Sequence, residues 1–254
     1  MIDSHAHIYL EDFDEDRDSV LEESAVGGVS HILMPNIDST SIDSMMAVED
    51  RDPRRFPAMM GLHPCSVNKH FEKELYLVED WLGKRPFIAV GEIGTDLYWD
   101  KTFWPEQQEA FRIQCELALK YELPVVIHCR ESIRQTIDLV TPFAEKGLRG
   151  AFHCFTGTAE EGRDIKALGF YLGIGGVVTF KNSGLDKVLG EIGQDQLLLE
   201  TDSPYLAPTP NRGKRNKPSY VGLVADRLAD IFSTAKEEIT QTTSANSRKL
   251  FGIP

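Results

Sequence analysis

The feature that most constrains this chain is a series of eight short β-rich runs, most of them separated by segments with helical periodicity. Several runs are almost continuously apolar, as at residues 125–127 and 197–199, which is typical of parallel strands buried on both faces. Eight such alternations predict an α/β fold, a single-domain (β/α)₈ TIM barrel over residues 1–254, with a doubly wound sheet as the alternative. The predicted strands are Ile2–His7, His31–Pro35, Phe56–His63, Phe87–Gly91, Pro124–His128, Gly150–His153, Phe170–Gly175 and Gln196–Asp202.

Three helix signals support this pattern. Residues 106–121 repeat apolar side chains at helical spacing behind a proline suited to a first turn. Thr158 with Glu161, and Thr234 with Glu237, have the spacing of a capping box and predict two further helix starts. The longest segment without clear periodicity is 203–218, and loops of that length tend to be functional or disordered.

Composition narrows the class of protein. The 254 residues are 41% hydrophobic, which is enough for a sizeable core, and no apolar run approaches the roughly 18 residues that a membrane span needs. Neither a signal peptide nor a CxxC pair is evident, so we expect a cytoplasmic protein with reduced cysteines. No feature indicates an obligate protein partner. With 27 basic and 40 acidic residues, the net charge of −13 repels nucleic acid at long range, and an anionic substrate would need a local basic patch.

The ends of the predicted strands carry the side chains that matter for function. In barrels of this class, reactive residues project from the carboxyl ends of the strands. Histidine and carboxylate at one mouth provide nitrogen and oxygen ligands for divalent metal ions, with no thiolate. The residues at or directly after the strand ends are His5, His7, His63, Glu92, His128, His153 and Asp202.

Strand alternation refines this set. His5 and His7 are two residues apart and therefore point to the same face, where they can hold one ion. Such a pair alone is weak evidence, but it is joined by matching residues at other strand ends. Glu200 has the same parity as Asp202, and we expect it to lie below Asp202 inside the barrel, either orienting a ligating histidine or serving as a structural acid.

A basic segment follows the last predicted strand. Residues 211–217 contain four positive charges, among them Arg212, Lys214 and Arg215, and Arg130 follows the strand that ends in His128. Basic runs are usually solvated surface, but this one adjoins the predicted metal site. We therefore expect it to hold substrate phosphates.

Six ordered motifs make the constellation recognisable. They read IDSHAH, GLHP, GEIG, IHCR, HCFTG and ETDSPYL, and together they cover residues 2–218 from near the start of the chain to the basic segment. In this order and spacing they resemble the TatD family of metal-dependent deoxyribonucleases. Two departures concern substrate preference: Thr95 stands where the family usually has leucine, and Lys217 where it usually has an acid before the proline.

The resemblance implies a two-metal hydrolase. His5 and His7 would bind one ion, His128 and His153 the other, Glu92 would bridge them, and Asp202 would ligate near the nucleophilic water and accept its proton. The strand-end argument reaches the same six residues but leaves open which acid bridges. His63, Arg130 and the basic segment match positions that the family assigns to substrate phosphate.

The resemblance also implies the substrate and the cofactors. We expect hydrolysis of DNA, single-stranded or at 3′ ends, in the 3′ to 5′ direction with release of nucleoside monophosphates; RNA and short oligonucleotides stay open. The two divalent ions would be Mg²⁺ or Mn²⁺, with Zn²⁺ or Co²⁺ as alternatives. Tyr98, Trp99 and Tyr205 are candidates for base stacking, although packing on the following helix is the favoured interpretation of Trp99.

Two other functions compete. An amidohydrolase-like barrel would cleave a C–N bond or a lactone with the same metal chemistry. Such sites commonly bridge their ions with a carbamylated lysine, however, and here the corresponding strand delivers Glu92. A non-catalytic barrel that uses metal only for stability is a further alternative. It would be expected to have lost ligands, whereas all six are present.

Overall fold

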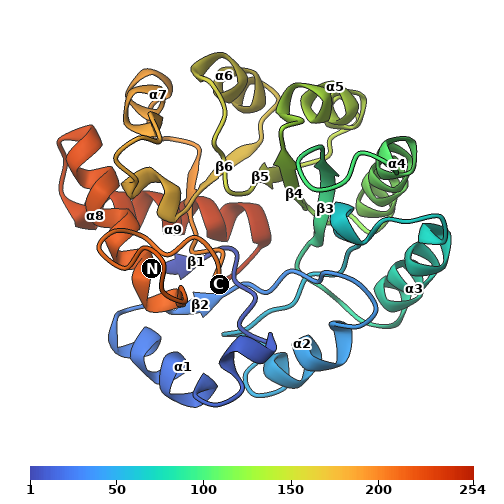
Figure 1. Cartoon of the computed structure of the whole chain (residues 1–254), viewed down its shortest axis with the longest axis horizontal. Helices are drawn as coiled ribbons and strands as arrows, with labels where there is room; N and C mark the ends of the chain where they lie inside the picture. The colour runs from blue at the N-terminus through green and yellow to red at the C-terminus, as the bar shows by residue number, and fades with distance from the viewer.

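The computed structural model describes residues 1–254 as a ring of parallel strands surrounded by helices (Figure 1). One sheet has the order β3-β4-β5-β6-β7, and β1 pairs with β2 in another; every pairing is parallel. The strands are β1 (Ile2–Asp3), β2 (His31–Ile32), β3 (Val90–Asp96), β4 (Val125–Arg130), β5 (Gly150–Phe152), β6 (Tyr171–Ile174) and β7 (Leu197–Leu199).

Residues 57–62 take the place of a strand between β2 and β3. Two parallel bridges join them to their neighbours, Met34–Ala58 and Met60–Val90. The strand predicted at Phe56–His63 is thus present as isolated bridges and not as a regular ladder. Pro57 has no N–H to donate, and the backbone packs so closely that a Cβ on Gly61 would lie 2.9 Å from the carbonyl carbon of Gly91.

The ring closes between β7 and β1. The Ser4 amide donates to the Leu199 carbonyl at 2.9 Å, and the His7 amide donates to the Ser203 carbonyl at 2.8 Å. Ala6 and Ser203 form a further parallel bridge. Eight strand positions therefore form a closed barrel, which confirms the predicted fold and excludes the doubly wound sheet.

Nine α-helices lie outside the ring, and short 3₁₀ turns occupy the loops at residues 11–13, 64–66, 176–179 and 218–220. None of the helices combines the length and apolar character needed to cross a membrane. Their bounds are α1 (Arg17–Val26), α2 (Ile42–Glu49), α3 (Phe71–Lys84), α4 (Trp104–Lys120), α5 (Ile133–Ala144), α6 (Ala159–Ala167), α7 (Leu185–Ile192), α8 (Val221–Phe232) and α9 (Lys236–Phe251).

The predicted helix starts have different outcomes. Helix α4 confirms the helix expected over 106–121. The capping box at α6 is confirmed, because the Thr158 side chain accepts from the Glu161 amide and the Glu161 carboxylate accepts from the Thr158 amide. The second predicted box is wrong: α9 begins after Ala235, and the Thr234 hydroxyl donates to Glu238 instead of pairing with Glu237.

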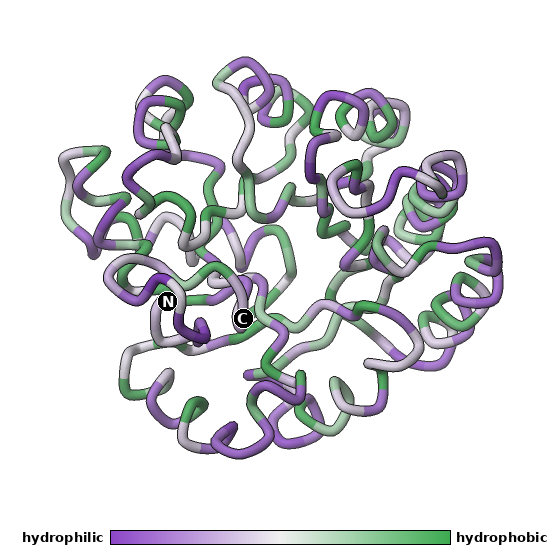
Figure 2. Tube along the Cα trace, viewed as in Figure 1, coloured by the Kyte–Doolittle hydropathy of each residue, from purple (hydrophilic) through white to green (hydrophobic).

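The apolar core has two layers. A large cluster fills the space between strands and helices, and Figure 2 shows hydrophobic colour along the central strands with mixed helices around them. A smaller cluster takes one residue from each of the eight strand positions and three from the end of α9 and the residues beyond it. Its members are Ile2, Leu33, Met59, Ala89, Val126, Ala151, Tyr171, Leu198, Leu250, Phe251 and Ile253.

This smaller cluster sits below the predicted metal site. Its members lie at or near the beginnings of the strands, so the C-terminal segment closes the bottom of the barrel. In β3 the register shifts between Val90 and Ile93, so Ala89 and Glu92 both face inward despite opposite parity. The bottom of the barrel is thus apolar and contributes to stability, whereas the mouth is polar and carries the predicted metal ligands.

Candidate metal centre

The predicted ligands converge at the carboxyl ends of the strands. His5 and His7 follow β1, Glu92 lies in β3, His128 in β4, His153 follows β5, and Asp202 follows β7. Their ligand atoms form groups that could hold a metal ion, among them His5, His7 and Glu92, and His5, His153 and Asp202. Except for His128 and Asp202, which are partly accessible, these side chains are buried.

Glu92 stands at the middle of the cluster. Its Oε2 lies 3.1 Å from His5 Nε2 and 3.4 Å from His7 Nε2, and its Oε1 lies 2.8 Å from His153 Nε2 and 3.0 Å from His128 Nδ1. Oε2 therefore faces the first pair of histidines, and Oε1 faces the second pair together with His63, whose Nε2 lies 3.2 Å away. Burial by itself would raise the pKa of the Glu92 carboxyl, but His153 and the other imidazoles hold that pKa well below its ordinary value.

Asp202 completes the first histidine pair. Its Oδ1 lies 3.7 Å from His5 Nε2 and 3.6 Å from His7 Nε2, and its side chain is 13% exposed. The backbone at Asp202 has φ +56°, a left-handed conformation that turns the chain sharply at the strand end. Burial raises the pKa of this carboxyl to about 6, although His153 and His7 oppose the shift. Asp202 can therefore take up or release a proton close to neutral pH.

A hydrogen-bond chain fixes the orientation of His7. The Tyr9 hydroxyl donates to the Pro35 carbonyl at 2.6 Å, so it accepts from His7 Nδ1 at 2.9 Å. The proton of His7 is then on Nδ1, and the Nε2 lone pair points toward Glu92. Tyr9 was not among the predicted site residues, although its parity continues that of His5 and His7 and could have revealed it.

Asp96 plays the same part for His128. Its Oδ2 accepts from His128 Nε2 at 2.9 Å, which leaves Nδ1 free to face Glu92. Burial opposes ionisation of Asp96, but His128 and the Trp99 and Tyr98 amides lower its pKa to about 2. Asp96 was not among the predicted site residues. Residues 92, 94 and 96 share one parity, and that signal places Asp96 on the inner face.

Glu200 lies beside His153, inside the barrel, as its parity predicts. Its Oε1 is 3.6 Å from His153 Nδ1, which is beyond hydrogen-bond distance, and it accepts from the Cys154 amide at 2.5 Å. Burial alone would lower the pKa of His153, but Glu92 and Glu200 raise it well above its ordinary value. Glu200 thus acts on His153 through its charge.

His63 is close to the centre but has the wrong tautomer for a ligand. Its Nδ1 accepts from the Cys65 amide at 3.0 Å, so the proton of the neutral ring is on Nε2. That nitrogen lies 3.2 Å from Glu92 Oε1. A protonated nitrogen cannot ligate metal, so His63 is a hydrogen-bond donor to the pocket, which suits the predicted contact with phosphate.

These donor atoms fit divalent ions. His5 Nε2 and His7 Nε2 lie 3.3 Å apart beside the Glu92 and Asp202 oxygens, and the Tyr9 contact leaves the His7 nitrogen without a proton. His128 Nδ1 and His153 Nε2 lie 3.3 Å apart beside the second Glu92 oxygen. Clustered lone pairs of nitrogen and carboxylate oxygen repel one another unless a cation lies between them.

A pocket of about 670 Å³ opens above the ligands. Arg130 lines it and makes no ion pair; its guanidinium lies 3.6 Å from the centre of the Tyr98 ring. Of the predicted phosphate contacts, His63 and Arg130 therefore reach the centre. Trp99, Tyr205 and Leu206 form its apolar walls.

The basic segment lies elsewhere, contrary to expectation. None of Arg212, Lys214 and Arg215 lines the pocket. The guanidinium of Arg215 makes a two-armed ion pair with Asp16, and that of Arg212 lies over the Phe180 ring at 4.1 Å. The position of this segment in the sequence predicts that it lies near the mouth. Acidic residues around α1 bind it at the surface instead, and this contact is not evident from the local sequence.

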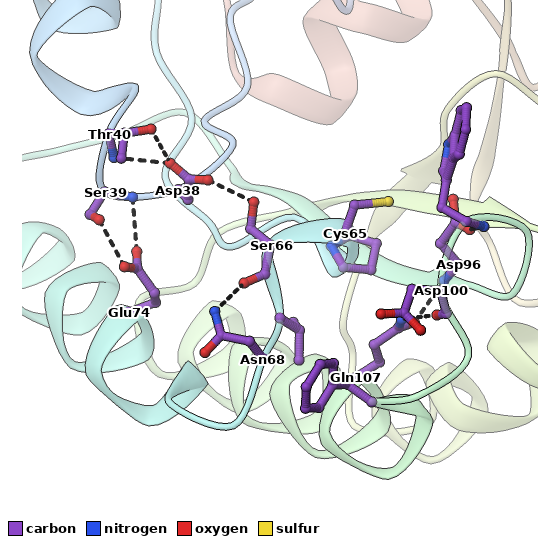
Figure 3. Close-up of a pocket in the computed structure, with 14 residues that line it drawn as sticks. Asp38, Ser39, Thr40, Cys65, Ser66, Asn68, Glu74, Asp96, Asp100 and Gln107 are labelled. Atoms are coloured by element: carbon purple, nitrogen blue, oxygen red, sulfur yellow. Dashed lines mark hydrogen bonds between the residues drawn. The ribbon is translucent and has the colours of Figure 1, made fainter.

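A second, acidic hollow adjoins the pocket (Figure 3). Its volume is about 360 Å³, and it shares Cys65, Ser66 and Trp99 with the metal pocket. Two of its carboxylates build their own loops: Asp38 accepts from the Ser66 hydroxyl at 2.6 Å, and Glu74 accepts from the Ser39 hydroxyl at 2.8 Å. Because no basic side chain lines the hollow, its carboxylates give it a negative charge.

A closed (β/α)₈ barrel with histidine and carboxylate ligands at its mouth defines the class of metal-dependent hydrolase barrels. The family model for TatD related DNases matches residues 2–252, and the chain belongs to this family of metal-dependent hydrolases.

Three similar proteins show how closely this chain matches known members of the family. The uncharacterized metal-dependent hydrolase YabD of Bacillus subtilis is 37% identical and covers 100% of this chain and 99% of its own. The 3′-5′ ssDNA/RNA exonuclease TatD of Cronobacter sakazakii is 32% identical, covering 99% and 97%. The crystal structure of YjjV from Escherichia coli, a TatD homologue, has a TM-score of 0.93 at 29% identity, covering 100% and 98%.

Proposed function

We propose that this protein is a two-metal phosphodiesterase that degrades single-stranded DNA from the 3′ end and releases nucleoside monophosphates. The observation that carries the proposal is the position of Glu92, with one carboxylate oxygen facing His5 and His7 and the other facing His128 and His153. A carboxylate placed between two histidine pairs could be shared by two divalent ions, which suits phosphodiester hydrolysis. The relative named as a 3′-5′ ssDNA/RNA exonuclease supports both the substrate and the direction.

Six residues would hold the ions. His5 and His7 would hold one and His128 and His153 the other, while Glu92 would be shared by both and Asp202 would add an oxygen on the side of the first pair. Nitrogen and oxygen donors of this type accept Mg²⁺ or Mn²⁺, and also Zn²⁺ or Co²⁺. The chemistry that two bound divalent ions supply is activation of a water molecule and stabilisation of charge on the phosphoryl oxygens.

The residues of the chain perform the remaining steps. Asp202, whose side chain is partly exposed beside the first histidine pair, would accept the proton of the attacking water. The Nε2–H of His63 and the guanidinium of Arg130 donate to the non-bridging phosphate oxygens, where charge accumulates during transfer. Asp96 and Tyr9 hold His128 and His7 in the tautomers that this arrangement needs.

An amide or lactone substrate is a weaker alternative. It would leave the unpaired cation of Arg130 without a role, and the bridging position carries Glu92 and not lysine.

The test uses a 5′-labelled single-stranded DNA oligonucleotide and chelator-stripped protein to which Mg²⁺ or Mn²⁺ is restored. We expect a ladder that shortens from the 3′ end only with metal, and no ladder with Glu92→Ala. The matched control is Glu22→Ala, because Glu22 is exposed and makes no hydrogen bond or ion pair. Folded, metal-loaded protein that cleaves amides or lactones and leaves the oligonucleotide intact would contradict the proposal.

A further inference from the structure

Exposed apolar side chains gather at the mouth of the barrel. Seven large hydrophobic residues are exposed in the whole molecule, and four of them lie in the two loops after β3 and β7. These four are Tyr98, Trp99, Tyr205 and Leu206, with exposures of 47%, 69%, 50% and 41%. The favoured prediction for Trp99, packing on the following helix, is thus wrong. Apolar surface left in water beside a polar pocket is typical of a ligand-binding site.

Trp99 and Tyr205 face the metal pocket from opposite sides. Counting residues 57–62 as the third strand position, β3 is fourth in the ring and β7 is eighth. Four steps in a ring of eight place the two loops across the mouth from one another (Figure 1). Both side chains line the same pocket, with the predicted metal ligands between them.

The backbone of each aromatic residue is anchored to a residue of the metal centre. The Trp99 amide donates to Asp96 Oδ1 at 3.0 Å, while the other oxygen of Asp96 accepts from His128. The Tyr205 amide donates to the Asp202 carbonyl at 2.8 Å, and the side chain of Asn216 donates to the Tyr205 carbonyl at 2.6 Å. The two rings are therefore carried by backbone that is already ordered, which lowers the entropy cost of binding.

Charge separates the path of a substrate backbone from that of its bases. Trp99 also lines the acidic hollow, to which Asp38, Glu74 and Asp100 contribute carboxylates (Figure 3). These carboxylates repel phosphate. Arg130 lies on the pocket side, with its guanidinium 5.4 Å from the centre of the Trp99 ring. A phosphate chain would run past Arg130, and only an uncharged part of the ligand would lie against the indole.

We propose that Trp99 and Tyr205 stack on the two nucleobases that flank the scissile phosphate, one on each side of the metal centre. This inference rests on the proposed function and specifies its substrate as an unpaired dinucleotide step. A phosphodiester carries one nucleoside on either side, which matches two platforms across the mouth. Bases held apart in this way cannot remain paired in a duplex, so single strands and frayed ends are the substrate.

The test is a comparison of KM and kcat on two single-stranded oligonucleotides. One is fully natural, and the other has abasic residues at its last two 3′ positions. We expect Trp99→Ala and Tyr205→Ala each to raise KM on the natural strand by about 5- to 150-fold, the usual contribution of one stacked base. On the abasic strand neither change should matter. Trp99→Phe and Tyr205→Phe keep a ring and should largely restore KM.

Tyr76→Ala is the matched control, because Tyr76 is 71% exposed on α3 and does not line the metal pocket. Equal effects of Trp99→Ala on natural and abasic strands would overturn the stacking proposal and leave the nuclease activity standing. If wild-type protein with metal cleaves neither strand, the proposed function fails. Quenching of Trp99 fluorescence by the natural strand, lost in Trp99→Ala, would in that case still uphold stacking, and absence of quenching would overturn it.

Discussion

At the scale of single residues, the metal centre depends on which nitrogen of each histidine carries a proton. Tyr9 settles this for His7 and Asp96 for His128, each through one hydrogen bond on the side away from the centre. Groups that hydrogen-bond the far side of a ligating histidine usually matter for metal affinity nearly as much as the ligands, because they set the orientation and basicity of the ring. These hydrogen bonds therefore orient the metal-facing nitrogens of His7 and His128 before metal arrives.

The Tyr9 hydroxyl provides a direct test. Tyr9→Phe removes the acceptor for His7 Nδ1 and the donor to the Pro35 carbonyl, while the ring keeps its place in the core. We expect metal affinity to fall about 10- to 100-fold and the free energy of unfolding of the metal-free protein to fall by only about 1 kcal/mol. Calorimetric metal titration and denaturant unfolding measure the two quantities. Tyr76→Phe, which removes an exposed hydroxyl that makes no hydrogen bond, should change neither.

Metal retention should depend on pH through the second histidine pair. Burial alone would lower the pKa values of His128 and His153, but Glu92 together with Asp96 and Glu200 outweighs burial and raises both. A raised pKa keeps the proton on the ring to higher pH, and a metal ion must displace that proton. Affinity therefore rises with pH, and loss on acidification should begin above pH 6.5, the ordinary value for histidine. Metal content after dialysis at pH 8, 7, 6 and 5 measures it, and constant content over this range would contradict the assignment.

At the scale of elements, strand ends could be predicted from sequence far better than loop contacts. Alternation within a strand is local, so the inward direction of His128, His153 and Asp202 follows from neighbouring residues. The pairing of Arg215 with Asp16 joins residues 199 positions apart and leaves no local signal. The second capping box fails for a different, local reason: Glu238 replaces Glu237 as the partner of Thr234 because the first turn of α9 begins one residue later than expected.

The two arginines should consequently behave differently toward nucleic acid. Arg130 lines the pocket without an ion pair, so Arg130→Ala should weaken oligonucleotide binding and reduce the salt slope of log K by about 1. Arg215→Ala should leave the slope unchanged, because its charge is neutralised by Asp16. Its expected cost in unfolding free energy is about 0–1 kcal/mol, typical of a solvent-exposed pair. Binding titrations from 50 to 200 mM salt would distinguish them, and a smaller slope only in the Arg215 variant would reverse this assignment.

At the scale of the whole molecule, the barrel separates stability from chemistry. The acidic net charge of −13 surrounds a mouth whose pocket is lined by a single unpaired arginine, so binding of an anion there depends on the metal ions and on Arg130. The opposite end is apolar and closed by the C-terminal segment. Periodicity predicted the ring of strands, but it could not show that the end of α9 completes the inner core, because that contact joins the two ends of the chain.

Phe251 tests this division of roles. It is 6% exposed and belongs to the apolar cluster at the bottom of the barrel, which contains a residue from each of the eight strand positions, whereas the ligands lie at the mouth. Phe251→Ala removes the whole buried ring and should lower the free energy of unfolding by about 3–5 kcal/mol. Because leucine fills more of that space than alanine does, Phe251→Leu should cost clearly less. Metal affinity measured well below the melting temperature should be unchanged in both variants. A loss of metal affinity in folded Phe251→Ala would mean that packing at the bottom also positions the ligands, since the strands that carry them begin in this cluster.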